Sequence, residues 1–314
     1  KRVKPTATYH YLENSGMLTR GWISRGPLND ALALKAAIKR VAPTSAIRNV
    51  LLVALISDLS TKIGNMKYGP EIYRGRSRRH VDVWKVFQTN VLQILRDLEK
   101  IEETEKLGGT RIFLGDARGC AGVLRTNGIR RIHAAISSPP YPTEHDYTRN
   151  TRLELAFLDF ITTKDCVRGI KQNMIRSHTK GIYTSDRDTD YIRDYISINK
   201  LADLVEEMCE GKTYGFARLY PTVIREYFGG MKRHFESIST VMSPRARYAV
   251  VVGDQASYFG IHIPTAKLLG ELAEDCGFEV ENTVLWRERR PSTGSKLIKE
   301  HALILKKVSP TRRG

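Results

Sequence analysis

The four residues Ser138-Pro139-Pro140-Tyr141 follow a short apolar run, and their types suit one particular kind of chemistry. Each proline fixes its own φ and restricts the residue before it, so the sequence predicts a rigid turn at the end of a strand. Such a turn holds a serine hydroxyl, a backbone carbonyl and an aromatic ring at fixed distances. Methylation of an amino group on a nucleobase needs these three groups. The same residues also suit a plain proline-stiffened turn after a buried strand.

The exocyclic amino nitrogen of cytosine or adenine is a weak nucleophile, because its lone pair is delocalised into the ring. If Ser138 Oγ and the Pro139 carbonyl accept its two hydrogens, the lone pair is freed to attack a sulfonium methyl group, and pre-placed acceptors are a catalytic device. Tyr141 would stack on the base, which must first leave the duplex. The proton that is lost can leave through water, so this chemistry needs no histidine base.

The Ser-Pro-Pro-Tyr turn resembles the catalytic motif of bacterial site-specific DNA amino-methyltransferases, most often those that modify cytosine at N4. Adenine N6 enzymes more often carry Asp or Asn in place of the serine. Upstream, Gly115-Asp116-Ala117-Arg118 after Ile112-Phe113-Leu114 is similar to the family's preceding strand and its acidic loop. Downstream, Tyr147-Thr148-Arg149 before Arg152-Leu153-Glu154-Leu155 is similar to the tyrosine, arginine and helix that follow the motif.

This resemblance implies a methyltransferase that uses S-adenosylmethionine as the methyl donor, flips its target base and belongs to a restriction-modification or phage-defence system. It assigns the catalytic role to Ser138, Pro139, Pro140 and Tyr141. It places Asp116, together with Ser137, on the side of the cofactor. A helix cap is an equally good reading of Asp116, because Asp often caps a helix after a strand. A restriction endonuclease is an implied further partner, and no metal ion is implied.

Composition points to a polyanionic partner. The 314 residues include 51 Lys and Arg against 34 Asp and Glu, a formal net charge of +17, while 41% of residues are hydrophobic. The charge therefore lies on a folded body, and neutralisation of phosphates makes double-stranded DNA the best-suited partner. A generally basic soluble protein is the alternative. No apolar run reaches about 18 residues, so no membrane span is expected.

The four cysteines, Cys120, Cys166, Cys209 and Cys276, form no CxxC pair and give no zinc site. Their scatter in a chain without a secretory apolar segment is typical of reduced thiols, which predicts a cytoplasmic protein.

The chain is expected to have three parts. Residues 1–27 form a basic arm or connector with no assigned fold, residues 28–106 a helical unit, and residues 107–314 the methyltransferase catalytic core. In the core, strands alternate with helices, which indicates an α/β fold with a mostly parallel sheet covered on both faces. Together with the resemblance, this pattern predicts a partial Rossmann-like class I S-adenosylmethionine-dependent methyltransferase sheet with a helical insertion.

The periodicity of apolar residues and the turn signals give the expected elements. Helices are expected at 28–41, 45–63, 81–103, 117–127, 151–162, 191–209, 222–242 and 263–276, with a turn and cap at 43–45. Strands are expected at 110–114, 131–137, 247–253, 279–286 and 301–307, the last two antiparallel. Residues 163–187 are expected to be a polar connection.

Residues 64–80 are the best candidate for contact with DNA, because arginines, tyrosines and glycines alternate there. Arginine holds phosphate or reads guanine edges, tyrosine stacks, and glycine lets a loop follow a groove. A solvated basic loop is the alternative reading. The DNA-binding residues predicted from this loop and from the motif's continuation are Lys67, Arg74, Arg76, Arg78, Arg79, Tyr147 and Arg149.

One family feature is missing from the sequence. Members bind S-adenosylmethionine with a Phe-x-Gly-x-Gly loop after a first strand, and neither this loop nor the next acidic strand end is found here. We expect these parts upstream of Lys1 or on a partner chain. Three readings stay open, namely a cytosine N4 methyltransferase, an adenine N6 methyltransferase, and a catalytically incomplete DNA-recognition subunit.

Overall fold

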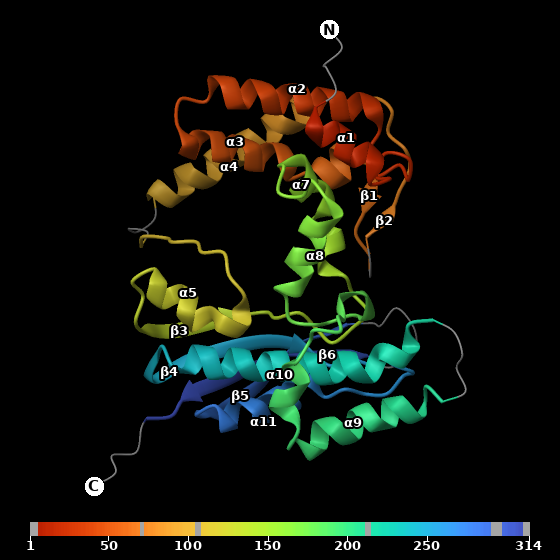
Figure 1. The fold of residues 1–314 in the computed structure, drawn as a ribbon. Helices are drawn as coiled ribbons and strands as arrows, with labels where there is room; N and C mark the ends of the chain where they lie inside the picture. Colours follow the sequence, from red (N-terminus) through yellow and green to blue (C-terminus); the bar gives the residue numbers. More distant parts are fainter. Residues whose placement is uncertain (1–5, 70–71, 104–107, 211–214, 290–296, 310–314) are drawn as a thin grey trace. The chain divides into compact units, whose positions relative to one another are not determined.

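The chain forms two compact units, each described here by itself (Figure 1). The computed structural model describes residues 6–69, 72–103, 108–210, 215–289 and 297–309. Unit 1 comprises Lys1–Arg111 and Tyr147–Gly169, and unit 2 comprises Ile112–Asp146 and Ile170–Gly314. The domain bounds expected from the sequence stay a proposal.

Unit 1 is mainly helical. Its elements are α1 (Ala7–Asn14), α2 (Arg25–Val41), α3 (Ser45–Ile56), the π-helical turn η1 (Leu59–Ile63), β1 (Met66–Lys67), β2 (Tyr73–Arg74), α4 (Val83–Glu103), α6 (Tyr147–Asn150) and α7 (Arg152–Phe157). The cap expected before α3 is confirmed, because the Thr44 side chain accepts a hydrogen bond from the Ile47 N–H. Residues 1–27, to which no fold was assigned, contain α1, which Thr6 caps in the same way.

Unit 2 is built on a four-stranded mixed sheet. Its strands are β3 (Ile132–Ser137), β4 (Met242–Gly253), β5 (Phe278–Arg289) and β6 (Ile298–Lys307), in the order β3-β4-β6-β5. Strands β3 and β4 are parallel, whereas β6 is antiparallel to both β4 and β5. The antiparallel final strands are confirmed. The expectation of a mostly parallel sheet is wrong, because β6 lies between two strands that it opposes.

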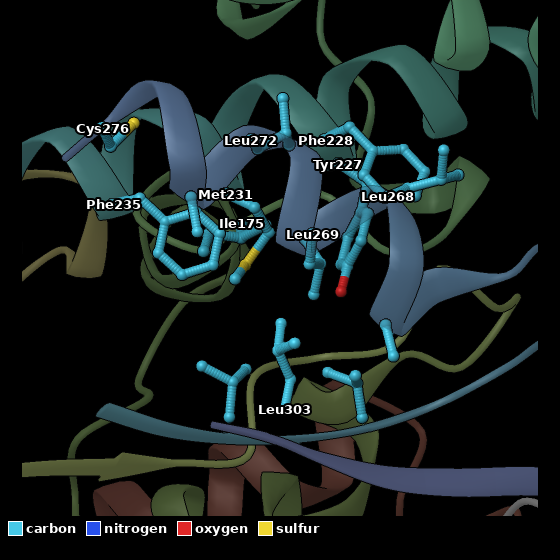
Figure 2. Close-up of a cluster of buried hydrophobic side chains, with 14 of the residues drawn as sticks. Ile175, Tyr227, Phe228, Met231, Phe235, Leu268, Leu269, Leu272, Cys276 and Leu303 are labelled. Carbon is cyan, nitrogen blue, oxygen red and sulfur yellow. The ribbon is translucent and has the colours of Figure 1, made fainter. Parts of the chain in front are cut away.

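The core of unit 2 lies between the sheet and two long helices, α10 (Tyr220–Ser239) and α11 (Thr265–Asp275) (Figure 2). Alternate residues of β4, namely Tyr248, Val250 and Val252, are buried, as expected for a strand with one covered face. Figure 2 shows Leu303 of β6 on the sheet side of this core. Two further helices, α5 (Cys120–Thr126) and α9 (Ile196–Glu207), contact α10.

The second face of the sheet differs from the expectation of cover on both faces. Ile136 on β3 is 83% exposed, and it pairs with Ala249, which alternates with the buried residues of β4. The described helices of unit 2 bury their apolar sides against one face only. The prediction of two covered faces is therefore wrong for the part of unit 2 that the structure describes.

Three local predictions need correction. No strand forms at 110–114, where Leu114 is fully exposed, because β3 pairs with β4 alone within the described residues. The helix expected at 151–162 ends at Phe157, since Asp159 adopts a left-handed φ of 69°. The polar connection at 163–187 contains a further helix, α8 (Lys164–Gln172). Among the described residues, no helix has the length and apolar character that crossing a membrane requires.

Candidate active site at the carboxyl edge of the sheet

Three strand ends meet at one edge of the sheet in unit 2. Strands β3, β4 and β5 all point the same way, because β6 is antiparallel to the last two and β3 is parallel to β4. Ser138, Asp254 and the end of β5 at Arg289 therefore lie at the same edge. The carboxyl edge is where α/β sheets bind their ligands.

The Ser138–Tyr141 turn leaves β3 at this edge with its chemical groups accessible. Ser138 is exposed, and Pro139, Pro140 and Tyr141 are half-buried. The hydroxyl groups of Ser138 and Tyr141 share a hydrogen bond, although burial raises the pKa of Tyr141 overall. Among the described residues, no backbone N–H donates to the Pro139 carbonyl. The serine and the carbonyl required for the proposed chemistry are thus both present at the surface.

The continuation of this turn is anchored by two carboxylates. Glu144 accepts hydrogen bonds from the Thr179 N–H at 3.1 Å and the Thr179 hydroxyl at 2.7 Å. Lys171 Nζ lies 2.7 Å from Asp146 Oδ2, and His178 Nε2 lies 3.7 Å from Asp146 Oδ1. Glu144 and Asp146 are therefore both bound to one neighbouring segment, residues 171–179.

That neighbouring segment is the largest feature of the site that the sequence did not reveal. Residues 175–179 are buried, although four of the five are polar: Ile175, Arg176, Ser177, His178 and Thr179. Burial lowers the pKa of His178 to about 4, and its Nδ1 has no hydrogen-bond partner among the described residues. Polar residues without a period predict surface, so only their partners in space, Glu144 and Asp146, identify this segment as internal.

Ser137 takes part in a buried hydrogen-bond chain. Its hydroxyl lies 2.7 Å from the Tyr248 hydroxyl, which lies 2.7 Å from His234 Nε2, and His234 Nδ1 lies 2.8 Å from the Ala117 carbonyl. A carbonyl only accepts, and burial lowers the pKa of His234, so the neutral ring carries its proton on Nδ1. Tyr248 then donates to Nε2, and Ser137 donates to Tyr248. The chain fixes the end of β3 against the residue after Asp116.

Asp116 has its carboxylate bound within the protein. It caps the short helix η2 (Ala117–Gly119) by accepting from the Arg118 N–H at 2.9 Å, and it forms an ion pair with Arg118 Nη2 at 2.6 Å. Burial acts to raise the pKa of Asp116, but the hydrogen bonds from Arg118 lower it overall. Arg118 also pairs with the buried Asp188 at 2.7 Å. These contacts fit the cap better than they fit a direct ligand of a cofactor.

Asp116 and Ser137 therefore both form hydrogen bonds within the protein in this arrangement. Their assignment to cofactor binding stays a prediction. Asp116 caps η2, and Ser137 fixes the end of β3.

The predicted DNA-contact residues belong to unit 1, and they divide into two kinds. Lys67, Arg74, Arg76 and Arg79 are exposed. Arg78 is instead half-buried and donates to the backbone carbonyls of Thr61 and Gly64, the latter at 2.8 Å. Its main role in the structure is to hold the π-helical turn.

Two further features bear on the same prediction. Arg79 and His80 line an open depression of about 480 Å³ with Gly26, Pro27, Asp30, Val81 and Asp82. Tyr147 and Arg149 fall in α6 and are half-buried. The DNA-binding role of all seven residues stays a prediction.

Comparison with known proteins finds a methyltransferase among the relatives of this chain. The strand order and the accessible turn define an α/β protein whose carboxyl edge carries polar groups. The chain is 24% identical over 190 residues to the type II methyltransferase M.BsoBI of Geobacillus stearothermophilus, a match that covers 55% of this chain and 36% of that protein. It is thus a distant homologue of a type II DNA methyltransferase and spans about a third of that relative's length. No family model matches the chain.

Solved structures give only partial superpositions. TTHA0409 of Thermus thermophilus, assigned by name to the DNA modification methylases, superposes with a TM-score of 0.32 and 17% identity over 66% of this chain and 57% of that one. Its complex with S-adenosyl-L-methionine gives a TM-score of 0.24 and 22% identity over 30% and 43% of the two chains. The description of the fold therefore rests on this chain's own strand order.

Proposed function

We propose that the chain is the catalytic part of a DNA amino-methyltransferase that transfers a methyl group from S-adenosylmethionine to N4 of a flipped cytosine. The observation that carries the proposal is the exposed Ser138 hydroxyl beside the Pro139 carbonyl, to which no backbone N–H of the described residues donates, at the carboxyl edge of the sheet. The similarity to a type II methyltransferase and the net charge of +17 support it.

In this proposal the turn acts on the amino group alone. Ser138 Oγ and the Pro139 carbonyl each accept a hydrogen bond from one N–H of the amino group. The nitrogen lone pair is then freed from delocalisation into the ring. Tyr141, half-buried and bonded to Ser138, stacks on the base after it leaves the duplex. S-adenosylmethionine supplies the methyl group, the C–S bond breaks as the N–C bond forms, and the surplus proton leaves to water.

The finer fold assignment belongs to the same proposal. The sheet order β3-β4-β6-β5 suits one half of a Rossmann-like class I methyltransferase sheet, with residues 28–106 as a helical insertion and 107–314 as the core. The other half would carry the Phe-x-Gly-x-Gly loop, either on another part of the protein or on a partner chain. A cognate restriction endonuclease is a further proposed partner.

Adenine N6 is the alternative acceptor. The serine favours cytosine, but the same two acceptors would bind the amino group of adenine equally well. Digestion of modified DNA followed by mass spectrometry of the nucleosides distinguishes them. N6-methyladenine as the sole product would replace the cytosine assignment.

A recognition subunit without activity is the second alternative, and the missing glycine loop favours it. Calorimetry of this 314-residue chain with S-adenosylmethionine tests it. Micromolar binding would exclude the recognition subunit, whereas no heat of binding would support it.

The direct test of the proposed chemistry is Ser138→Ala. Loss of one pre-placed acceptor is expected to lower methyl transfer to mixed-sequence plasmid DNA by about 100-fold or more. Affinity for the duplex should stay the same. Ser239→Ala, on the last turn of α10 with its hydroxyl bound to the Glu236 carbonyl, is the matched control and should transfer normally. Normal turnover by Ser138→Ala would contradict the assigned role.

A further inference from the structure

A buried carboxylate beside the turn binds two arginines at once. Glu300, at the start of β6, is 3% exposed and lies opposite both Gly253 of β4 and Arg287 of β5. Its Oε2 accepts from Arg287 Nε, and its Oε1 lies 3.1 Å from Arg289 Nε. A buried charge needs a partner, but one guanidinium is sufficient to neutralise it. The second arginine leaves this cluster with a net positive charge.

The arginines reach the candidate active site through Arg289. Its guanidinium lies 6.0 Å from the centre of the Tyr141 ring, and its Nη2 donates to Gln255 Oε1 at 3.3 Å. Gly253 makes this packing possible, because a Cβ there would lie 3.2 Å from Tyr141 Cε2 and 3.1 Å from Glu300 Cγ. The Tyr141 ring, the Glu300 side chain and the Gln255 amide are thus packed around one glycine.

The Arg287 side chain lies at the solvent-exposed end of this cluster. Its side chain is 64% exposed, and Glu300 is its one ion-pair partner within the described residues. The contact to Glu300 uses Nε, so both terminal nitrogens remain available for a second ligand. A guanidinium fork of this kind matches the oxygens of a phosphate group.

We propose that Arg287 and Arg289 form a binding site for a phosphodiester of the DNA backbone next to the extruded base, with Glu300 orienting both guanidiniums. The inference rests on the proposed function and adds a site to it. An anion there relieves the repulsion between two arginines that share one carboxylate. Because Arg289 also lies over Tyr141, the phosphate and the ring would hold the same nucleotide from two sides.

The salt dependence of duplex binding tests this site. Fluorescence anisotropy with a labelled mixed-sequence duplex is measured from about 50 to about 300 mM KCl, a range in which phosphate contacts dominate affinity. Arg287→Ala combined with Arg289→Ala should lower the magnitude of the slope of log K against log salt by about 0.9, the contribution of the one phosphate that the two arginines share. Arg289→Lys keeps the charge and should keep the slope.

Arg247→Ala is the matched control. Arg247 is also 64% exposed in its side chain and is also paired with a glutamate of β5, Glu281 at 2.6 Å, but it lies six residues before Gly253 on β4. Its loss removes the same charge far from the carboxyl edge, so the slope should not change.

Two failures can be told apart. If Arg287→Ala combined with Arg289→Ala keeps the slope of the unmodified chain, or shares one slope change with Arg247→Ala, the phosphate site is wrong and the proposed function is untouched. If the unmodified chain does not bind the duplex even at about 50 mM KCl, where phosphate contacts are strongest, DNA is not its partner, and both proposals fall.

Discussion

The turn after β3 and the basic loop at 64–80 were both expected to be functional, yet their charged side chains behave in opposite ways. In the turn, Glu144 and Asp146 are bound to Thr179 and Lys171. In the basic loop, Arg78 donates to the backbone carbonyls of Thr61 and Gly64. Lys67, Arg74, Arg76 and Arg79 extend from the loop as exposed residues.

The difference fits the two tasks that we propose. Chemistry on an amino group needs acceptors held in place before the substrate arrives, because reorganisation during the reaction adds to the barrier. Contact with phosphates needs charge and reach, and flexible exposed side chains supply both. If the comparison is correct, substitutions in the turn change turnover, and those in the loop change affinity.

The largest expected effect tests the loop. Arg74→Ala combined with Arg76→Ala should weaken duplex binding at about 100 mM salt by about 100-fold, roughly tenfold for each lost phosphate contact. The slope of log K against log salt should fall by about 1.8. Anisotropy measures both, while the unfolding free energy should not change, because these residues are exposed.

Arg78→Ala is the contrast within the same loop. It removes the same charge but leaves the carbonyls of Thr61 and Gly64 without a donor. We expect a loss of about 1–3 kcal/mol in the unfolding free energy and little change in the salt slope. If Arg74→Ala, Arg76→Ala and Arg78→Ala weakened duplex binding equally, the division of this loop into DNA-contacting and structural arginines would be wrong.

The same contrast shows which features could be predicted from the sequence and which could not. The turn at Ser138 was placed correctly at a strand end, because proline restriction and an apolar run are local signals. The role of Arg78 was not distinguished from that of Arg76, because both belong to the same arginine-rich run at residues 74–79 and only the contacts with backbone carbonyls separate them. Residues 175–179 were expected only as part of a polar connection, because polar side chains without a period give no local sign of burial.

The missing strand at 110–114 shows a different limit. Ile112-Phe113-Leu114 has the composition of a strand, but strand formation depends on a neighbour to pair with, which no local pattern supplies. The mixed sheet is a similar case, since the position of β6 between β4 and β5 is set by pairing between distant segments. Arg287 and Arg289 lie 13 and 11 positions before Glu300 in the sequence, and the pairing of β5 with β6 brings them together.

A smaller effect concerns the buried histidine beside the turn. His178 has a pKa of about 4, below its ordinary value of 6.5, with Asp146, Lys171, Lys180 and His145 as the charged or titratable groups around it. Between those two pH values the unfolded chain binds a proton that the folded chain does not. The unfolding free energy should therefore fall as pH is lowered through this window, by up to about 1.4 kcal/mol at about pH 5.5.

Urea unfolding of the unmodified chain and of His178→Gln at a series of pH values from about 8 to about 5 measures this effect. The variant should show a flatter dependence on pH, whatever its stability at the upper end of the series. Parallel curves for the two proteins would mean that His178 titrates normally and that the segment at 175–179 is open to water.

The smallest effect addresses the anchor itself. Glu144 and Thr179 share two hydrogen bonds, at 3.1 and 2.7 Å, of which the one from the threonine hydroxyl is removed by Thr179→Val. Comparison of Glu144→Gln, Thr179→Val and the double variant gives the coupling free energy of the pair, which we expect to be about 1 kcal/mol in stability.

If the anchor preorganises the turn, each single variant should also lower turnover several-fold at saturating DNA, with duplex affinity unchanged. Thr189→Val, which removes a similar hydroxyl bond of 2.8 Å to Glu226 away from the turn, controls for general loosening of unit 2. A loss of stability without a loss of turnover would mean that the turn holds its geometry through its two prolines alone, and the contrast with the basic loop would then rest on Pro139 and Pro140.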